Sequence, residues 1–391
     1  MPFSLFSQTL QEVIDYSIQH NFQIQILEEE SKIVEKQAQI EAVWSDPVLK
    51  AGLNDIQAVH TLSRNQEAMQ NQYVTLSQAI PLNNRLELAS DVEKEKLLLF
   101  KEKKNILNTN IAFAVREAFI AAQYSKKNLK ILEHYITFLK KPLNLLIELS
   151  AVERDSVAKF LKTQLLQKSY QFQKQSWQQN IQMAKERIEL IGNIEIDEFS
   201  DEVLVEDYLS QNLDDLIAQL EMNSPQLKMR EVLKKVANKG VALAKANEQT
   251  DFTVTGGYYQ RFDRNDYVSV SLSFPLYIHK KQANKTVQAM RKSNIENLSY
   301  QQLALELRQQ LKIEFYQLKQ YSQELKILKE NSVKIQQLIT NAKLSLSGGA
   351  SLLSYYELFS KKVNNKLSIS KKEQTIALSE NRVKQLLGVV Q

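Results

Sequence analysis

The segment Val268-Ser269-Val270-Ser271-Leu272-Ser273-Phe274-Pro275-Leu276 alternates apolar residues with three serines. A period of two puts the apolar side chains on one face of a β-strand and the serines on the other. A second segment, Val74-Thr75-Leu76-Ser77-Gln78-Ala79-Ile80-Pro81-Leu82, follows nearly the same pattern, with Gln78 interrupting the apolar set. Almost all of the remaining chain is typical of helices. The sequence therefore predicts matched pairs of short strands in a largely helical protein.

Composition excludes several functional classes. The chain has 391 residues, with 50 Lys or Arg and 45 Asp or Glu, so its net charge is only +5. The charges are interspersed, whereas a nucleic-acid-binding protein is expected to cluster basic residues, so no nucleic-acid partner is predicted. There is no cysteine, which excludes disulfides, thiolate metal sites and a lipid-anchored N-terminal cysteine.

No apolar run is long enough for a transmembrane helix. The start, Met1–Leu10, has neither the basic residues nor the apolar core of a signal peptide. If the protein is exported, its signal peptide is therefore expected to be missing from this chain.

Glycines and prolines divide the chain into two predicted repeats, each running helix, strand, turn, strand, long helix, tight turn and long helix. In residues 1–190 the strands are expected at about 48–59 and 73–82, and the long helices at about 83–149 and 155–190. In residues 223–391 the strands are expected at about 251–260 and 267–276, and the long helices at about 279–346 and 351–387. Residues 191–222 form an acidic linker with a short helix near Asn212–Met222.

The long helices need partners. About 65 to 70 residues at 1.5 Å each make a rod of roughly 100 Å, which is not stable alone in water. Spacings of four and three residues, typical of a coiled-coil seam, separate Leu311, Phe315, Leu318, Ser322 and Leu325. We therefore expect each long helix to pack on its successor as an antiparallel hairpin.

The strands have the length and the two-faced pattern of membrane-crossing β-strands, with lipid on the apolar face and water on the other. The lipid-facing residues are expected to be Val74, Leu76, Ile80, Val268, Val270, Leu272 and Phe274. Aromatic residues near the strand ends are typical of the girdles of such barrels, and here they are Tyr258, Tyr259, Phe262, Tyr267 and Tyr277. Because four strands cannot close a barrel, and lipid does not tolerate an open edge, the chain is expected to oligomerise. The alternative is a soluble β-sheet that caps a coiled coil.

Three motifs resemble the TolC-like outer-membrane efflux protein family, and the resemblance covers essentially the whole chain. Asn223-Ser224-Pro225-Gln226-Leu227 resembles the helix opening of the family's second half. The strand-to-helix corners at 78–82 and 273–276 resemble the corresponding corners of the family. Residues 348–357, Gly-Gly-Ala-Ser-Leu-Leu-Ser-Tyr-Tyr-Glu, resemble the family's turn at the periplasmic tip.

The resemblance implies a homotrimer whose three chains share one α/β barrel. Twelve strands would lie in the outer membrane of a Gram-negative bacterium, and the helices would form a tunnel through the periplasm. The tips would meet a periplasmic adaptor and an inner-membrane pump, and the acidic region around Glu195–Glu221 would form an equatorial belt. The implied function is the exit duct of a tripartite efflux pump for small molecules or metal ions. A type I protein secretion duct is the alternative, and the cargo stays open.

The resemblance also indicates gate residues at the tips. Asp155 matches a family aspartate, Glu357 keeps an acid, and Ser354 replaces the usual aspartate. Three copies of one acid around a constriction would favour cations. The alternative is that both acids only stabilise helix N-termini. Candidate adaptor contacts are Ser150, Ala151, Val152, Gly348, Gly349, Ala350 and Ser351, although a plain tight turn also explains the glycines.

Nothing in the sequence indicates an enzyme or a bound cofactor. The histidines His20, His60, His134 and His279 are far apart and lack the spacing of metal ligands. A different class of function, a soluble coiled-coil scaffold, stays open beside the channel.

Overall fold

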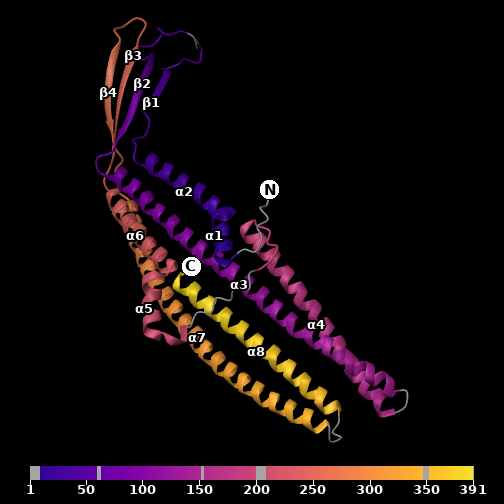
Figure 1. The fold of residues 1–391 in the computed structure, drawn as a ribbon. Helices are drawn as coiled ribbons and strands as arrows, with labels where there is room; N and C mark the ends of the chain where they lie inside the picture. Colours follow the sequence, from indigo (N-terminus) through magenta and orange to yellow (C-terminus); the bar gives the residue numbers. More distant parts are fainter. Residues whose placement is uncertain (1–8, 60–62, 151–153, 200–207, 347–351, 391) are drawn as a thin grey trace. The chain divides into compact units, whose positions relative to one another are not determined.

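The structure is a computed structural model that describes residues 9–59, 63–150, 154–199, 208–346 and 352–390. It confirms a mainly helical chain with a small antiparallel sheet (Figure 1). The helices are α1 (Leu10–His20), α2 (Phe22–Glu41), α3 (Arg85–Ser150), α4 (Arg154–Gly192), η1 (Tyr208–Ser210), α5 (Leu213–Asn223), α6 (Pro225–Ala246), α7 (Lys281–Leu346) and α8 (Leu352–Leu387). The strands are β1 (Val48–Asn54), β2 (Asn71–Ile80), β3 (Phe252–Gln260) and β4 (Tyr267–Ser273).

The chain forms two compact units, and each unit takes segments from both halves of the sequence. Unit 1 contains the residues up to Ile26, Lys104–Pro225 and the residues from Ala304 onward. Unit 2 contains Leu27–Lys103 and Gln226–Leu303, and therefore holds all four strands. The predicted repeats at 1–190 and 223–391 are a different division of the chain and stay a prediction.

The helix that the sequence predicts before the first strand is divided at Asn21 into α1 and α2. Thr9 caps α1 in a capping box with Glu12, in which each side chain binds the other residue's backbone N–H. Asn21 is extended, and its side chain accepts a hydrogen bond from the Gln23 backbone N–H at 2.9 Å while donating one to the Ile191 carbonyl at 2.7 Å. The asparagine thus ends α1 and starts α2, a local competition for backbone groups typical of this residue.

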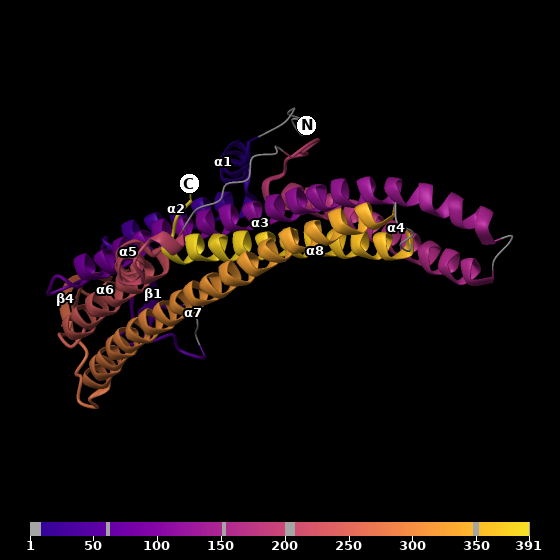
Figure 2. The same ribbon diagram turned by 60° about the horizontal axis from the view of Figure 1, so that its bottom comes forward.

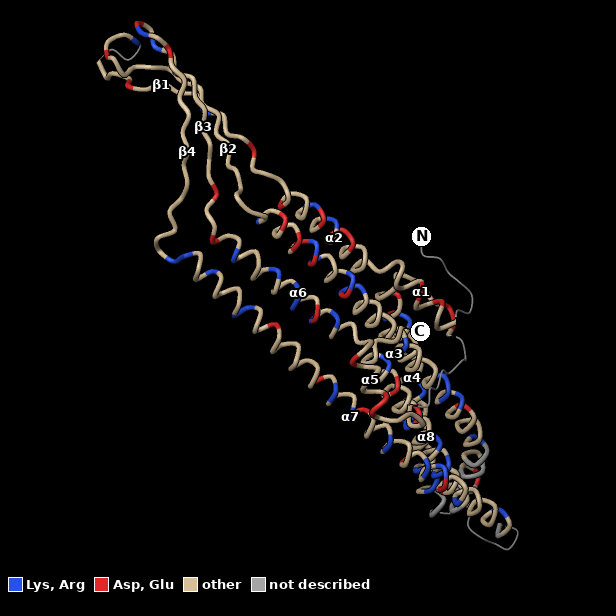
Figure 3. The backbone as a smooth tube through the Cα atoms, turned by 90° about the vertical axis from the view of Figure 1, so that its left-hand side faces the viewer, with Lys and Arg blue, Asp and Glu red and all other residues tan. Residues whose placement is uncertain are grey.

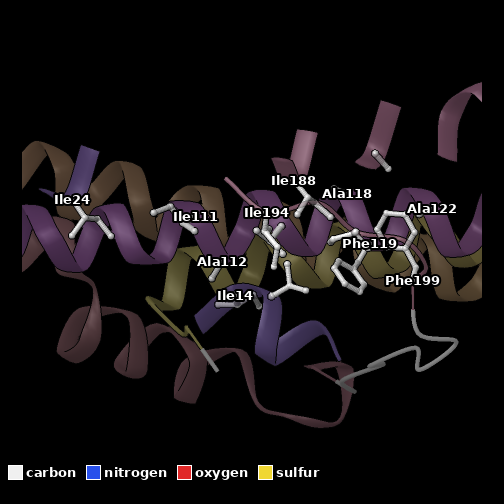
Figure 4. Packing of buried hydrophobic residues seen from close by; sticks show 14 residues of the cluster. Ile14, Ile24, Ile111, Ala112, Ala118, Phe119, Ala122, Ile188, Ile194 and Phe199 are labelled. Atoms are coloured by element: carbon white, nitrogen blue, oxygen red, sulfur yellow. The ribbon is translucent and has the colours of Figure 1, made fainter. Parts of the chain in front are cut away.

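The core of unit 1 lies where α1, α3 and α4 meet (Figure 4). Small residues of α3, such as Ala112 and Ala118, let the neighbouring segments approach, and Phe119 packs edge-on against Phe199 with ring centroids 5.0 Å apart. The buried set is Val13, Ile14, Ile24, Ile111, Ala112, Val115, Ala118, Phe119, Ala122, Ala184, Ile188, Ile194, Ile196 and Phe199. The segment after α4, within the predicted acidic linker, therefore contributes apolar side chains to this core.

Within unit 1, α7 and α8 run side by side in both Figure 1 and Figure 2. Leu311 and Leu318 of the predicted seam are buried, while Phe315, Ser322 and Leu325 are half-buried. Lys372 binds Glu324 at 2.5 Å, and the Asn365 side chain donates to the Leu328 carbonyl at 3.1 Å. The α3–α4 pair has a similar cross-link, Lys174–Glu133 at 2.8 Å.

The turn after α8 requires glycine. Gly388 has φ of 74°, a left-handed conformation in which the Val389 N–H bonds to the Lys384 carbonyl at 3.0 Å. A Cβ at Gly388 would lie 2.6 Å from the Pro225 ring and 3.2 Å from the Asn223 carbonyl. The predicted boundary at Leu387-Gly388 therefore has both a conformational and a packing cause.

In unit 2 the four strands form one antiparallel sheet in the order β1-β2-β3-β4. Where the strands meet the helices, Arg85 at the start of α3 binds Asp251 before β3 at 2.6 Å. The Asn83 side chain donates to the Ala246 carbonyl at 2.6 Å. These two contacts join segments from both halves of the chain at the base of the sheet.

The outer strands are shorter than predicted. β1 ends at Asn54 rather than near residue 59, because its partner β2 begins opposite it at Asn71 and Asp55 turns into the left-handed region with φ of 56°. β4 ends at Ser273, so Phe274 and Pro275 lie beyond the strand.

Candidate functional site in the sheet and the helical hairpins

Strand pairing gives the sheet one mainly apolar face. Val74 of β2 lies opposite Tyr258 of β3, which in turn lies opposite Val268 of β4. Leu76, Gly256 and Val270 form the next row in the same way. Val74 is 48% exposed and Val270 is 78% exposed. The predicted set Val74, Leu76, Val268, Val270 and Leu272 shares this exposed face, together with Leu49 and Leu53 of β1, while Ile80 lies on it half-buried and Phe274 lies outside β4.

The opposite face is polar. Ser77, Thr255 and Ser271 form one row across three strands, and the hydroxyls of Ser77 and Thr255 are 2.8 Å apart. Because side chains alternate along each strand, every hydroxyl row is separated from the next by an apolar row on the other face. The sheet thus has the two-faced character that the sequence pattern predicts.

The four strands carry one charged residue, Lys50, which lies on the polar face. Figure 3 shows the contrast between the strands, with few charges, and the helices, along which both basic and acidic residues are distributed. Charged side chains are costly in lipid, so their rarity here suits a hydrocarbon neighbour better than water.

The tyrosines of the predicted aromatic girdle lie on both faces of the sheet. Tyr259 lies opposite Tyr73 on one side and opposite Tyr267 on the other, and all three are on the polar face. Tyr258 alone of these four lies on the apolar face. The sequence located the aromatic residues near the strand ends, but the face of each depends on the register between strands.

The turn between β3 and β4 is held by Asp266. Its carboxylate accepts hydrogen bonds from the Tyr258 hydroxyl and, at 2.9 Å, from the Arg261 backbone N–H. The Arg261 guanidinium donates to the Asn265 carbonyl at 2.8 and 3.1 Å. The Tyr258 hydrogen bond, followed by that of the Arg261 N–H, lowers the pKa of Asp266 because both favour the ionised carboxylate.

Among the gate candidates, Glu357 forms an ion pair with a lysine side chain. It lies in the first part of α8 and pairs with Lys162 of α4 at 3.0 Å, with both side chains largely exposed. Asp155 lies in α4 and Ser354 in α8, but their side chains are outside the described part of the structure, as is that of Ser150 at the end of α3. The predicted adaptor contacts Ala151, Val152, Gly348, Gly349, Ala350 and Ser351 lie outside the described residues altogether.

An aromatic cluster lies beside Glu357, and we did not predict it from the sequence. It consists of Tyr135 and Phe138 of α3, Tyr170 of α4, and Tyr356 and Phe359 of α8. The rings of Phe138 and Phe359 stack at 4.2 Å, and those of Tyr135 and Tyr170 meet edge-on at 5.1 Å. A cavity of about 510 Å³, lined in part by Tyr135, Tyr356 and Glu357, opens beside it. The sequence signal for this cluster was the pair Tyr355-Tyr356, which precedes Phe359 by four and three residues, the spacing of neighbours on one side of a helix.

Two tyrosines in the aromatic cluster differ in their hydrogen bonding. The Tyr170 hydroxyl bonds to Asn364 at 3.0 Å and to Ser360 at 3.3 Å. The Tyr135 hydroxyl is buried and has no hydrogen-bond partner among the described residues. Burial raises the pKa of both phenols, since it disfavours the charged phenolate. The cluster therefore joins α3, α4 and α8 mainly through apolar contact.

In the described residues no helix is sufficiently long and apolar to cross a membrane. The same residues contain no group of three or more His, Cys, Asp or Glu side chains arranged to hold a metal ion.

No family model and no curated protein matches this sequence. Solved structures match over almost the whole chain. The open state of the MtrE outer membrane channel of Neisseria gonorrhoeae has a TM-score of 0.77 at 15% identity, covering 97% of this chain and 89% of its own. A membrane protein from Pseudomonas aeruginosa has a TM-score of 0.81 at 13% identity, covering 99% of this chain and 92% of its own. The outer membrane protein VceC from Vibrio cholerae has a TM-score of 0.73 at 15% identity, covering 97% and 96%. The chain therefore has the fold of the TolC-like outer-membrane channels.

Proposed function

We propose that the chain is one subunit of an outer-membrane channel that serves as the exit duct of an efflux pump and has no enzymatic activity. The observation that carries the proposal is the sheet, with its exposed apolar face, its polar face and its single charged residue. Exposed valine and leucine rows are unfavourable in water, and lipid would cover them. The fold shared with known outer-membrane channels supports the same function.

The two outer strands suggest how the subunits assemble. β1 and β4 are the ends of the described four-stranded sheet, and each therefore has an edge of backbone groups without a strand partner within that sheet. Lipid cannot supply hydrogen bonds to such groups, so β4 of one copy would pair with β1 of the next. Three copies of a four-stranded sheet would supply the twelve strands of a closed barrel. The polar face would then line the water-filled passage.

The helical hairpins would continue this passage through the periplasm. Their tips, at 150–152 and 348–351, would contact a periplasmic adaptor that connects the duct to an inner-membrane pump. Near one tip, Glu357 is bound to Lys162 across α4 and α8. We propose that this pair, together with Asp155, opposes opening of the tips, which would occur by repacking of the hairpins.

The cargo is proposed to be small molecules or metal ions. Export of polypeptides by a type I secretion system is the alternative within the channel class, because a polar passage does not discriminate between them. A soluble coiled-coil scaffold is the alternative of another class, and it would leave the apolar face of the sheet in water.

Membrane fractionation followed by planar-bilayer recording tests the proposal. We expect the native protein in the outer-membrane fraction, as detergent-dependent trimers that give discrete conductance steps in the bilayer. A stable, detergent-free monomer or dimer that produces no conductance would contradict the channel and favour the scaffold.

A further inference from the structure

A row of three stacked tyrosines crosses the polar face of the sheet near the end that bears the turn between β3 and β4. This tyrosine row consists of Tyr73, Tyr259 and Tyr267, one from each of β2, β3 and β4. Ring centroids are 5.6 Å apart for the first pair and 4.8 Å for the second, with interplanar angles of 29° and 4°. A lipid-facing girdle, as predicted from the sequence, does not account for the tyrosine row, because these three tyrosines share the face of the serines and threonines.

Glycines make room for these rings. A Cβ at Gly52, opposite Tyr73 in β1, would lie 2.5 Å from the Tyr73 hydroxyl oxygen and 2.7 Å from the ring. A Cβ at Gly257 would lie 2.8 Å from the ring of Tyr259. Both rings therefore lie against bare backbone, and a larger residue at either glycine would force them to move.

Each end of the tyrosine row carries a cation. The Lys50 ammonium lies 5.9 Å from the Tyr73 ring centroid, and the Arg261 guanidinium lies 5.2 Å from that of Tyr267. Aromatic faces are electronegative and attract cations, whereas ring edges are electropositive. Because the faces are turned toward each other and toward the two cations, the row leaves its electropositive ring edges to a ligand, while the Tyr73 hydroxyl lies over the backbone of Gly52.

No acidic residue of the strands compensates the charge of Lys50. Lys50 is exposed, is the single charged residue of the four strands, and forms no ion pair with a carboxylate in the described part of the chain. Arg261 shares its turn with Asp266, whose carboxylate accepts hydrogen bonds from Tyr258 and the Arg261 backbone and attracts the guanidinium, so Lys50 is the cation of the two that lacks an acidic partner among the described residues. The polar face at this level thus combines two cations, aromatic edges and hydroxyl donors.

We propose that Lys50 and the tyrosine row form a binding site for organic carboxylates, most favourably those attached to an aromatic ring. The carboxylate would pair with the Lys50 ammonium and accept hydrogen bonds from phenolic hydroxyls, while the ligand's ring would pack on the edges of the tyrosines. The location of the site on the exit path rests on the proposed channel, where three copies would contribute three such sites at one level of the passage.

Single-channel recording with matched probes tests this site. Benzoate and benzylammonium have the same ring and opposite charges. We expect benzoate, but not benzylammonium, to interrupt the current of the wild-type protein, and Lys50→Gln to weaken this interaction about three- to tenfold. Lys50→Arg keeps the charge and should retain most of the effect, and Lys50→Glu should shift the reversal potential toward cation preference. Equal interruption by both probes, or no change with Lys50→Glu, would overturn the proposal.

A measurement independent of conduction separates this site from the channel itself. Saturation-transfer NMR on the detergent-solubilised protein should detect benzoate, with the signal reduced by Lys50→Gln and by Tyr259→Leu, whereas Tyr259→Phe should reduce it less. Benzoate binding without any conductance would support the proposed binding site and contradict the proposed channel function. Conductance without Lys50-dependent binding of benzoate would contradict the proposed binding site and leave the proposed channel function supported. If the tyrosines only brace the sheet, Tyr259→Leu should lower stability and leave the benzoate signal per folded protein unchanged.

Discussion

The sheet of unit 2 and the aromatic cluster of unit 1 differ in how far their apolar side chains are exposed. In the cluster, Tyr135 and Tyr170 are 1% and 2% exposed, because helices α3, α4 and α8 of the same chain cover them. In the sheet, Val268 and Val270 remain 77% and 78% exposed. Burying a large apolar side chain contributes about 1.5–3 kcal/mol, so the first region completes its packing within one chain and the second does not. Apolar surface left in this way is typical of a surface that meets lipid or another subunit.

The largest effect on stability is expected when a charge is introduced on the apolar face of the sheet. Val270→Arg and Ser271→Arg alter neighbouring residues of β4 that point to opposite faces. If lipid covers the apolar face, Val270→Arg should destabilise the membrane-inserted protein by about 2–4 kcal/mol, while Ser271→Arg should cost much less. Urea unfolding in lipid vesicles measures the difference. Similar, small effects for both variants would mean that the Val270 face lies in water.

A smaller effect should separate the two buried tyrosines of the aromatic cluster. Tyr170→Phe removes the hydrogen bonds to Asn364 and Ser360 and leaves the Asn364 side chain without this donor, so we expect a loss of about 1–2 kcal/mol of unfolding free energy. Tyr135→Phe removes a hydroxyl that has no hydrogen-bond partner among the described residues, so its effect should be near zero or stabilising. Thermal unfolding followed by circular dichroism compares them. Equal losses would contradict the difference in hydrogen bonding, because both substitutions keep the ring and remove only the hydroxyl.

The smallest effect on stability should come from the exposed ion pair. Glu357 and Lys162 are both largely in solvent, so Glu357→Ala should change the unfolding free energy by less than about 1 kcal/mol. If the pair opposes opening of the tips, the same substitution should nevertheless raise single-channel conductance, and more so together with Asp155→Ala. Lys162→Gln serves as the matched control from the other side of the pair. Unchanged conductance in all three variants would count against the proposed gate.

Much of the fold could be predicted because its determinants are local. Alternation in 268–273 identified β4, and Leu311 and Leu318 of the heptad spacing are buried as expected. The aromatic cluster could not be predicted, because it depends on which turns of α3, α4 and α8 meet. The division at Asn21 was also missed. The Asn21 side chain competes locally for the Gln23 backbone N–H, and its second hydrogen bond, to the Ile191 carbonyl, joins residues 170 positions apart.

The sequence by itself determined which residues of each strand share a face, because side chains alternate with the backbone whatever surrounds it. The tertiary structure decided which rows these residues join. Ser77 and Thr255 are separated by 178 residues, and no local pattern fixes their pairing. A register shifted by one residue would have turned Tyr259 to the face of the sheet opposite Tyr73. The tyrosine row and its contact with Lys50 therefore arise from packing between distant segments rather than from the sequence of any one strand.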